Sequence, residues 1–343
     1  GRVFHAPFVS AVPGLKLEVI VQRRGDEAAK AYPEARILRS FEEALADTAI
    51  QLVVIGTPNE THFDLAKQAL HAGKHVVIDK PFAATSAQAK ELIELAAARK
   101  LVLAPFHNRR WDGDFLTVRT LLEQKALGRL VTFESHFDRF RPLARGTTWK
   151  ESGNPANGML FDLGPHLVDQ ALALFGSPQA ITASVRKDRD VTEIEDAFDI
   201  TLHYDRLLAH CRATILACDA APRFLLHGTH GSFKKYGLDP QEPALVAGAK
   251  VPRQGDPAKW LLEDEANWGT LTVAPDPAAP GILTRTRIQT ELGDYRGYYA
   301  NVRDAINGAA QLAVKPEDAY RVVRLLEMAR ESSAEGRTLA VKF

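Results

Sequence analysis

The chain has 343 residues, of which 45% are hydrophobic and 25% are charged, and these proportions are typical of a globular protein with room for two domains. Its 43 lysine and arginine residues balance 43 aspartate and glutamate residues, so no net field would draw in nucleic acid or an anionic membrane. No apolar run approaches the roughly 20 residues of a membrane helix, and the first residues form no signal pattern. We therefore expect a cytoplasmic protein that binds neither nucleic acid nor membrane.

The chain contains two cysteines, Cys211 and Cys218. Cys211 falls in a segment with strand-like character, and Cys218 falls close to the turn beside it. Two such residues can build neither a disulfide framework nor a metal cluster. We expect two buried thiols and no bound metal.

The N-terminal part of the sequence alternates between strand-like and helix-like segments. Short apolar runs that read as buried strands lie at 17–21, 50–55, 75–78 and 101–104. Ser40 with Glu43, and Thr85 with Gln88, mark the starts of helices between them. This alternation predicts a doubly wound parallel sheet, in which ligands bind at the carboxyl ends of the strands.

Polar groups follow three of these predicted strands. In chain order they are Thr57, Pro58, Asn59 and His62, then Lys80 and Pro81, then His107 and Asn108. Because the carboxyl ends of parallel strands meet at one edge of a sheet, we expect these groups to share that edge.

The start of the chain contains features of a dinucleotide-binding fingerprint. Gly1 suits its third glycine, although the first strand and the first two glycines are absent from the sequence. Arg23 and Arg24 stand about twenty residues further on, where an NAD enzyme would carry an acidic residue for the ribose 2′-hydroxyl. A guanidinium group matches a 2′-phosphate, so NADP is favoured over NAD. A solvated basic turn is the alternative.

The second half of the chain is predicted to form a sheet of a different kind. Strand-like segments follow one another at 130–140, 180–187, 197–204, 207–216 and 223–228. Such a succession indicates a mostly antiparallel sheet with one covered and one free face, and the free face, if apolar, would be an oligomer interface. Helices are expected at 112–126, 295–308 and 316–335, and 239–268 reads as irregular. We place the domain boundary between residues 121 and 122.

Three side chains could perform proton transfer. Asp162 and His166 are four positions apart, so on a helix they project from one face. Lys80 ends a predicted strand and is followed by Pro81, which fixes the turn. Its ammonium would stabilise negative charge on a substrate oxygen, Asp162 would orient the hydroxyl, and His166 would accept the hydroxyl proton. A structural Asp–His pair and a solvated lysine remain the alternative on these residues alone.

Together these segments resemble the Gfo/Idh/MocA family of NAD(P)-dependent oxidoreductases. The resemblance covers nearly the whole chain and rests on Gly56-Thr57-Pro58-Asn59 with His62, on Asp79-Lys80-Pro81, and on Gly158-x-x-x-Asp162-x-Gly164-x-His166. Asp79 stands where the family usually has glutamate. The run Phe106 to Asp112 is most similar to the branch that holds NADP-dependent scyllo-inositol dehydrogenase.

The resemblance implies a Rossmann domain at 1–121 and a substrate domain at 122–343, with homodimers or homotetramers formed through the second sheet. It implies that Lys80 contacts both substrate and nicotinamide, that Asp162 assists it, and that His166 is the general base. The cofactor-binding residues expected with Lys80 are Gly1, Arg2, Arg23, Arg24, Thr57, Pro58, Asn59, His62 and Asn108.

The substrate implied is a cyclic polyol or sugar, such as scyllo-inositol, whose secondary alcohol or ketone exchanges a hydride with NADP, or with NAD. Polar groups and an aromatic wall suit such a ligand. Candidates to line the cleft are Arg110, Trp111, Trp149 and Lys150. The alternatives are an NAD-using sugar dehydrogenase and a non-catalytic regulator that senses a sugar or a cofactor.

Overall fold

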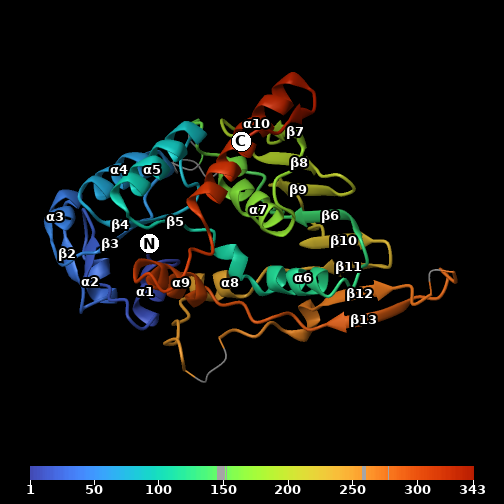
Figure 1. Cartoon of the computed structure of the whole chain (residues 1–343), viewed down its shortest axis with the longest axis horizontal. Helices are drawn as coiled ribbons and strands as arrows, with labels where there is room; N and C mark the ends of the chain where they lie inside the picture. Colours follow the sequence, from blue (N-terminus) through green and yellow to red (C-terminus); the bar gives the residue numbers. More distant parts are fainter. Residues whose placement is uncertain (145–150, 152, 257–259, 277) are drawn as a thin grey trace.

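The N-terminal part of the chain is built on parallel strands with helices between them (Figure 1). This computed structural model describes residues 1–144, 151, 153–256, 260–276 and 278–343. β1 (Val19–Val21) pairs with β2 (Arg36–Leu38), and β3 (Leu52–Ile55), β4 (His75–Ile78) and β5 (Leu103–Pro105) form a second parallel sheet. The helical segments here are α1 (Ala6–Ala11), α2 (Glu27–Ala31), α3 (Phe41–Ala46), η1 (Asn59–Thr61), α4 (His62–His71) and α5 (Ser86–Arg99).

Both faces of the sheet formed by β3, β4 and β5 are covered, which explains why its strands are apolar at nearly every position. Val76 and Ile78 pack in one hydrophobic cluster with α4 and α5. Val77, between them, packs in another cluster with α1 and with α9 (Arg296–Ile306), a helix from the far end of the chain. The predicted doubly wound arrangement is confirmed.

The second sheet has nine strands in the order β13-β12-β11-β10-β6-β9-β8-β7-β14. β6 and β9 are parallel neighbours, and the other neighbouring pairs are antiparallel, as the sequence predicts. The strands predicted from alternation are β6 (Leu130–His136), β7 (Ala180–Arg186), β8 (Ala197–His203), β9 (Leu208–Thr214) and β10 (Phe224–Gly228). The strands that sequence reasoning missed are β11 (Gly231–Lys235), β12 (Gly269–Val273), β13 (Thr284–Ile288) and β14 (Leu339–Ala340).

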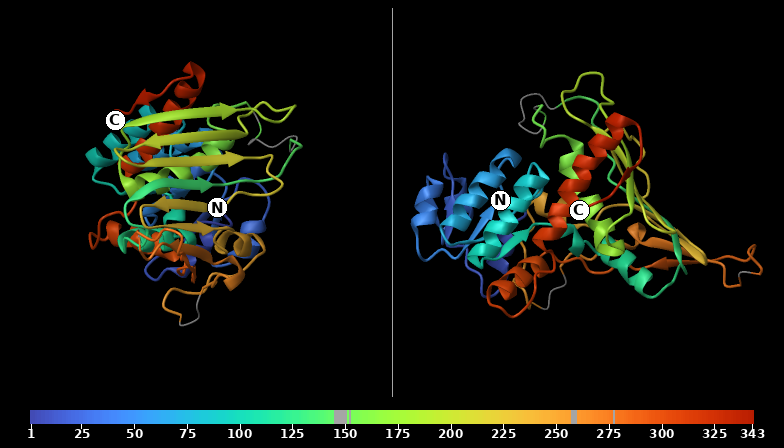
Figure 2. Two further views of the ribbon diagram at one scale, coloured as in Figure 1. Left: turned by 90° about the vertical axis from the view of Figure 1, so that its right-hand side faces the viewer. Right: turned by 45° about the horizontal axis from the view of Figure 1, so that its top comes forward.

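Helices cover one face of this nine-stranded sheet. The core beneath them contains side chains of α6 (Gly113–Glu123), α7 (Met159–Phe175) and α10 (Pro316–Glu335). In Figure 2 the strands lie in front of these helices in one view, and the opposite face of the sheet is open. Other helical segments are η2 (Asn108–Trp111), α8 (Gln241–Val246) and η4 (Glu265–Asn267). α8 corrects the expectation that 239–268 is irregular throughout.

The open face of the nine-stranded sheet is polar. The sequence-based expectation of an oligomer interface was conditional on an apolar free face, and this face is not apolar. On β8, Ile200 points into the core, whereas Asp199 and Thr201 alternate with it and lie on the other face. Arg186 and Arg212 from the neighbouring strands pair with Asp199 there. Any contact through this face must therefore match charges rather than bury an apolar patch.

Cys211 is buried, but Cys218 is exposed because it lies beyond the end of β9, so the expectation of two buried thiols is wrong for Cys218. Along the described ranges, no helix combines the length and the apolarity needed to cross a membrane.

Candidate active site

The polar groups predicted to share one sheet edge do follow neighbouring parallel strands. Thr57 comes after β3, Lys80 after β4 and His107 after β5, and these strands are adjacent in register. His62 joins the first two turns, because its ring nitrogens lie 2.9 Å from the Thr57 carbonyl oxygen and 2.8 Å from the Pro81 carbonyl oxygen. The buried His62 ring therefore links the turn after β3 to the turn after β4.

Lys80 reaches from this edge to the first turn of α7. Its Nζ donates to Asp162 Oδ1 at 2.6 Å and to the Asp162 carbonyl oxygen at 2.8 Å. α7 begins beside the sheet edge, and Gly164 lets it approach α10 closely, since a Cβ there would lie 2.8 Å from Leu326 Cδ2. An ammonium group has three N–H donors. With two of them directed to Asp162, one remains for the oxygen of a ligand.

His166 lies one turn after Asp162 on the same face of α7. It is 6% exposed, and its Nδ1 has no hydrogen-bond partner among the described residues. Burial, together with the positive charges of Arg109 and Lys80, holds the pKa of His166 well below its usual value of 6.5, and the Asp162 carboxylate opposes this only weakly. The imidazole is therefore neutral at pH 7 and can accept a proton.

Arg139 is a member of the site that sequence reasoning missed. Its Nη1 lies 3.5 Å from Asp162 Oδ2, so the two carboxylate oxygens of Asp162 face two different cations. The guanidinium also lies 5.3 Å from the centre of the Phe137 ring. The sequence placed Arg139 inside a predicted strand at 130–140, but β6 ends at His136 and Arg139 lies in the segment after it.

His107 adds two further unpartnered atoms at the sheet edge. Neither of its ring nitrogens has a hydrogen-bond partner within the described part of the chain, and the side chain is buried. Burial lowers the pKa of His107, so it too is neutral. Buried polar groups in native proteins are almost always satisfied, so these atoms, with Nδ1 of His166, are where a ligand or ordered water would bond.

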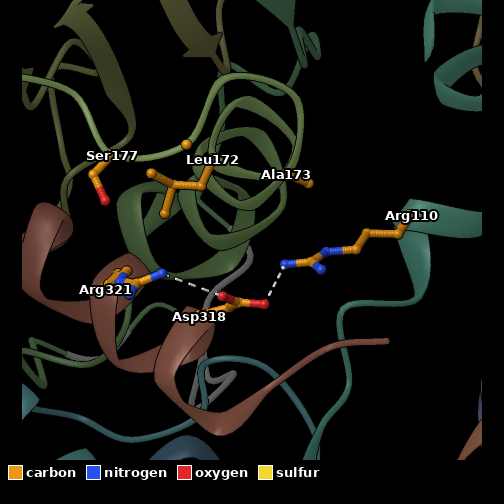
Figure 3. Close-up of a pocket in the computed structure, with 7 residues that line it drawn as sticks. Arg110, Leu172, Ala173, Ser177, Asp318 and Arg321 are labelled. Carbon is orange, nitrogen blue, oxygen red and sulfur yellow. Dashed lines mark hydrogen bonds and ion pairs between the residues drawn. The ribbon is translucent and has the colours of Figure 1, made fainter. Parts of the chain in front are cut away.

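Arg110, predicted to line the cleft, is held by two carboxylates. Its Nε and Nη2 lie 2.9 and 2.6 Å from Asp169 of α7, and Nη2 lies 3.2 Å from Asp318 of α10. Figure 3 shows Arg110 and Arg321 approaching Asp318 from opposite sides, at a cavity of about 210 Å³. Burial alone would lower the pKa of Arg110, but its two carboxylate partners raise it well above its ordinary value.

The other predicted site residues differ in their surroundings. Trp111 packs its ring 5.6 Å from that of Tyr298, and Trp149 and Lys150 lie outside the described residues. Asn59 donates to the Ala156 carbonyl oxygen at 2.7 Å, which ties the edge to the segment before α7. Asn108 is buried in η2, whereas the cofactor-binding residues predicted near the start of the chain, Gly1, Arg2, Arg23 and Arg24, are exposed.

Comparison with known proteins identifies the family. Residues 1–107 match the oxidoreductase family NAD-binding Rossmann fold, and residues 119–342 match the C-terminal alpha/beta domain of the same family. The uncharacterized oxidoreductase YdgJ of Escherichia coli is 40% identical over 99% of this chain and 95% of its own length. The scyllo-inositol 2-dehydrogenase (NADP(+)) IolW of Bacillus subtilis is 36% identical over 100% of this chain and 93% of its own length.

Solved structures agree with this assignment. The structure of yvaA from Bacillus subtilis superposes with a TM-score of 0.94 at 35% identity, covering 100% of this chain and 95% of that one. The YPO2259 structure from Yersinia pestis gives a TM-score of 0.92 at 40% identity, with 100% and 94% covered. Both domains, and their order along the chain, therefore match those of one family. The chain belongs to the Gfo/Idh/MocA family of oxidoreductases.

Proposed function

We propose that this protein is an NADP-preferring dehydrogenase that interconverts a secondary alcohol and a ketone on a cyclic polyol or sugar. The observation that carries the proposal is the contact of Lys80 with Asp162 beside a buried, neutral His166. A lysine of the cofactor edge thereby meets a carboxylate and a base from the second half of the chain. The similarity to a scyllo-inositol dehydrogenase supports a polyol as substrate.

The residues fit a nicotinamide and a hydroxyl at the sheet edge. When bound, NADP would supply the hydride acceptor. The ammonium of Lys80 would direct its remaining N–H at the substrate oxygen and stabilise the negative charge that develops there. His166 would take the hydroxyl proton, which its lowered pKa permits at pH 7. Asp162 would hold Lys80 in place and, through its second oxygen, share the charge of Arg139.

Arg23 and Arg24 support the choice of NADP. Both are exposed directly after β1, whose carboxyl end lies where the adenosine ribose of a Rossmann-bound dinucleotide is held. Guanidinium groups would pair more strongly with a 2′-phosphate than with a bare hydroxyl.

The open face of the nine-stranded sheet is the surface we assign to a homodimer or homotetramer. Its ion pairs, such as Arg186 with Asp199, would be matched by those of a second copy. Light scattering after size-exclusion chromatography at low and high salt tests this assignment. A monomer under both conditions would remove it.

Activity is tested with the full chain and a panel of inositols and aldoses, by following the absorbance of reduced cofactor with NADP and NAD separately. We expect turnover of at least one cyclic polyol or sugar, with kcat/KM higher for NADP. Tight binding of cofactor or sugar without turnover of any panel member would contradict the proposal and favour a regulator. Higher kcat/KM with NAD would favour an NAD-using sugar dehydrogenase.

A further inference from the structure

His5 is a buried imidazole at the cofactor edge of the sheet, with no role in the reaction described above. It lies one residue before α1, is 3% exposed, and contacts groups from four other segments of the chain. We propose that His5 is a positioning residue, which fixes the carboxylate of Asp79 and through it the backbone of Lys80. The inference rests on the proposed function, since it assumes that Lys80 contacts the substrate.

The contacts form a continuous chain from a C-terminal helix to Lys80. His5 Nδ1 lies 2.7 Å from the hydroxyl of Tyr299 on α9. On the opposite side of the ring, Nε2 lies 3.3 Å from Asp79 Oδ2, which is within ion-pair distance although the geometry among the described residues is not that of a hydrogen bond. The other oxygen of Asp79 accepts the backbone N–H of Lys80 at 2.7 Å. A displacement of the His5 ring would therefore be transmitted to the turn that carries Lys80.

The two neighbours of His5 limit how its ring can bond. The pKa of Asp79 is lowered, because the effect of His5 and the neighbouring charges exceeds the burial that would raise it, so its carboxylate can only accept. Burial raises the pKa of Tyr299 well above its ordinary value, so its phenol keeps the proton. In the tautomer of His5 that carries its hydrogen on Nε2 alone, that hydrogen would face Asp79, and Nδ1 would accept from the Tyr299 hydroxyl.

The sheet edge is shaped around this ring. The Phe106 ring, just after β5, lies 4.3 Å from the His5 ring, centre to centre. Gly56, just after β3, faces the other side, where a Cβ would lie only 3.2 Å from His5 Cδ2. His5 is thus enclosed by the ends of β3, β4 and β5, the three strands whose ends carry the predicted site. A merely space-filling role would not need its two nitrogens.

Two variants separate the polar role of His5 from its packing. His5→Phe keeps an aromatic ring against Phe106 but removes both nitrogens, and Tyr299→Phe removes the hydroxyl alone. Tyr298→Phe is the matched control, because its hydroxyl contacts the Ala104 carbonyl oxygen at 3.3 Å and belongs to a different contact. His5→Gln, which retains a donor and an acceptor, shows whether function is rescued if His5→Phe folds poorly.

The first measurement is hydrogen–deuterium exchange of the Lys80 backbone amide, which needs no substrate or cofactor. We expect faster exchange in His5→Phe and Tyr299→Phe, wild-type exchange in Tyr298→Phe, and exchange closer to wild type in His5→Gln than in His5→Phe. Wild-type exchange at Lys80 in both His5→Phe and Tyr299→Phe would overturn the inference, as would equal acceleration in Tyr298→Phe.

The second measurement is the steady-state rate with a deuterated substrate. We expect kcat to fall on the order of 10- to 100-fold in His5→Phe, because a misplaced catalytic group slows the chemical step. The primary isotope effect should rise, while the Kd of NADPH from its fluorescence stays within about threefold, since the cofactor contacts other than that of Lys80 are intact. A fall in kcat with an unchanged isotope effect would indicate a smaller folded fraction and overturn the inference. If the wild type turns over no substrate, the proposed function fails, and the exchange data still decide the role of His5.

Discussion

Two clusters of charged side chains lie along one face of α7 and differ in how fully they are paired. At the N-terminal end, Asp162 meets Lys80 and Arg139, and Nδ1 of the neighbouring His166 has no hydrogen-bond partner in the part of the chain that the structure describes. Two turns later, Asp169 is closed off by a bidentate contact from Arg110. The same residue types serve both clusters. The candidate site is therefore distinguished by hydrogen-bond donors and acceptors, on Lys80 and His166, that remain available to a ligand.

The largest effect should follow replacement of Lys80 by methionine, which keeps the length of the side chain and removes the charge. We expect kcat to fall on the order of 10³-fold, because one donor at the developing oxyanion contributes about that much. Thermal stability should hardly change, because the pair with Asp162 is partly exposed. Initial rates and a melting curve check both expectations, and a rate within a few-fold of wild type would remove Lys80 from the mechanism.

Arg110→Ala should act in the opposite way, on stability rather than on rate. It leaves Asp169, whose side chain is 2% exposed, as a buried carboxylate without its partner, which costs about 3–5 kcal/mol in the free energy of unfolding. Arg321→Ala is the control, because Arg321 also approaches Asp318 but is 43% exposed, and its loss should cost at most about 1 kcal/mol. Urea unfolding compares them, and equal losses would contradict the distinction between the two clusters.

Cofactor preference should change when the two arginines after β1 are removed together. With Arg23→Ala and Arg24→Ala, kcat/KM for NADP should fall at least roughly 10- to 100-fold, because the loss of even one charged hydrogen bond to phosphate costs about 1.5–3 kcal/mol. The value for NAD should stay near wild type. Initial rates with both cofactors give the ratio, and an unchanged ratio would exclude these residues from 2′-phosphate binding.

The pH dependence of alcohol oxidation should reflect the buried His166. Its pKa in the folded protein lies below 6.5, so kcat/KM should hold as the pH falls to 6.5 and decline only at lower pH. In the unfolded chain His166 takes up a proton near pH 6.5, whereas in the folded chain it stays neutral at that pH. The free energy of unfolding should therefore also fall as the pH drops below 6.5. An acid limb at or above pH 6.5, or one that persists in His166→Gln, would argue against His166 as the base.

Much of the fold could be predicted because local patterns and tertiary packing agree. The runs at 75–78 and 316–335 became β4 and α10 with the same bounds. Among the missed strands, β13 has a clear physical reason. β13 is exposed at four of its five residues, so no buried face imposes alternation on it.

The site was partly predictable for the same kind of reason. Strand ends identify a shared edge, and helical spacing places Asp162 and His166 on one face, so both follow from local sequence. Arg139 and His5 did not follow, because their importance depends on contacts with Asp162 and Asp79 that are distant in the chain. The carboxylate partners of Arg110 did not follow either, because a sequence does not show which arginine finds carboxylate partners.

The most direct test compares Asp162→Asn with Asp169→Asn, two equal changes on one face of α7, by kcat and by the free energy of unfolding. We expect Asp162→Asn to lower kcat at least about 100-fold while stability changes by less than about 1 kcal/mol. Asp169→Asn should lose about 3 kcal/mol or more of stability, because Arg110 is left without its main partner, yet keep the kcat of the folded fraction. Wild-type kcat in Asp162→Asn would contradict the account.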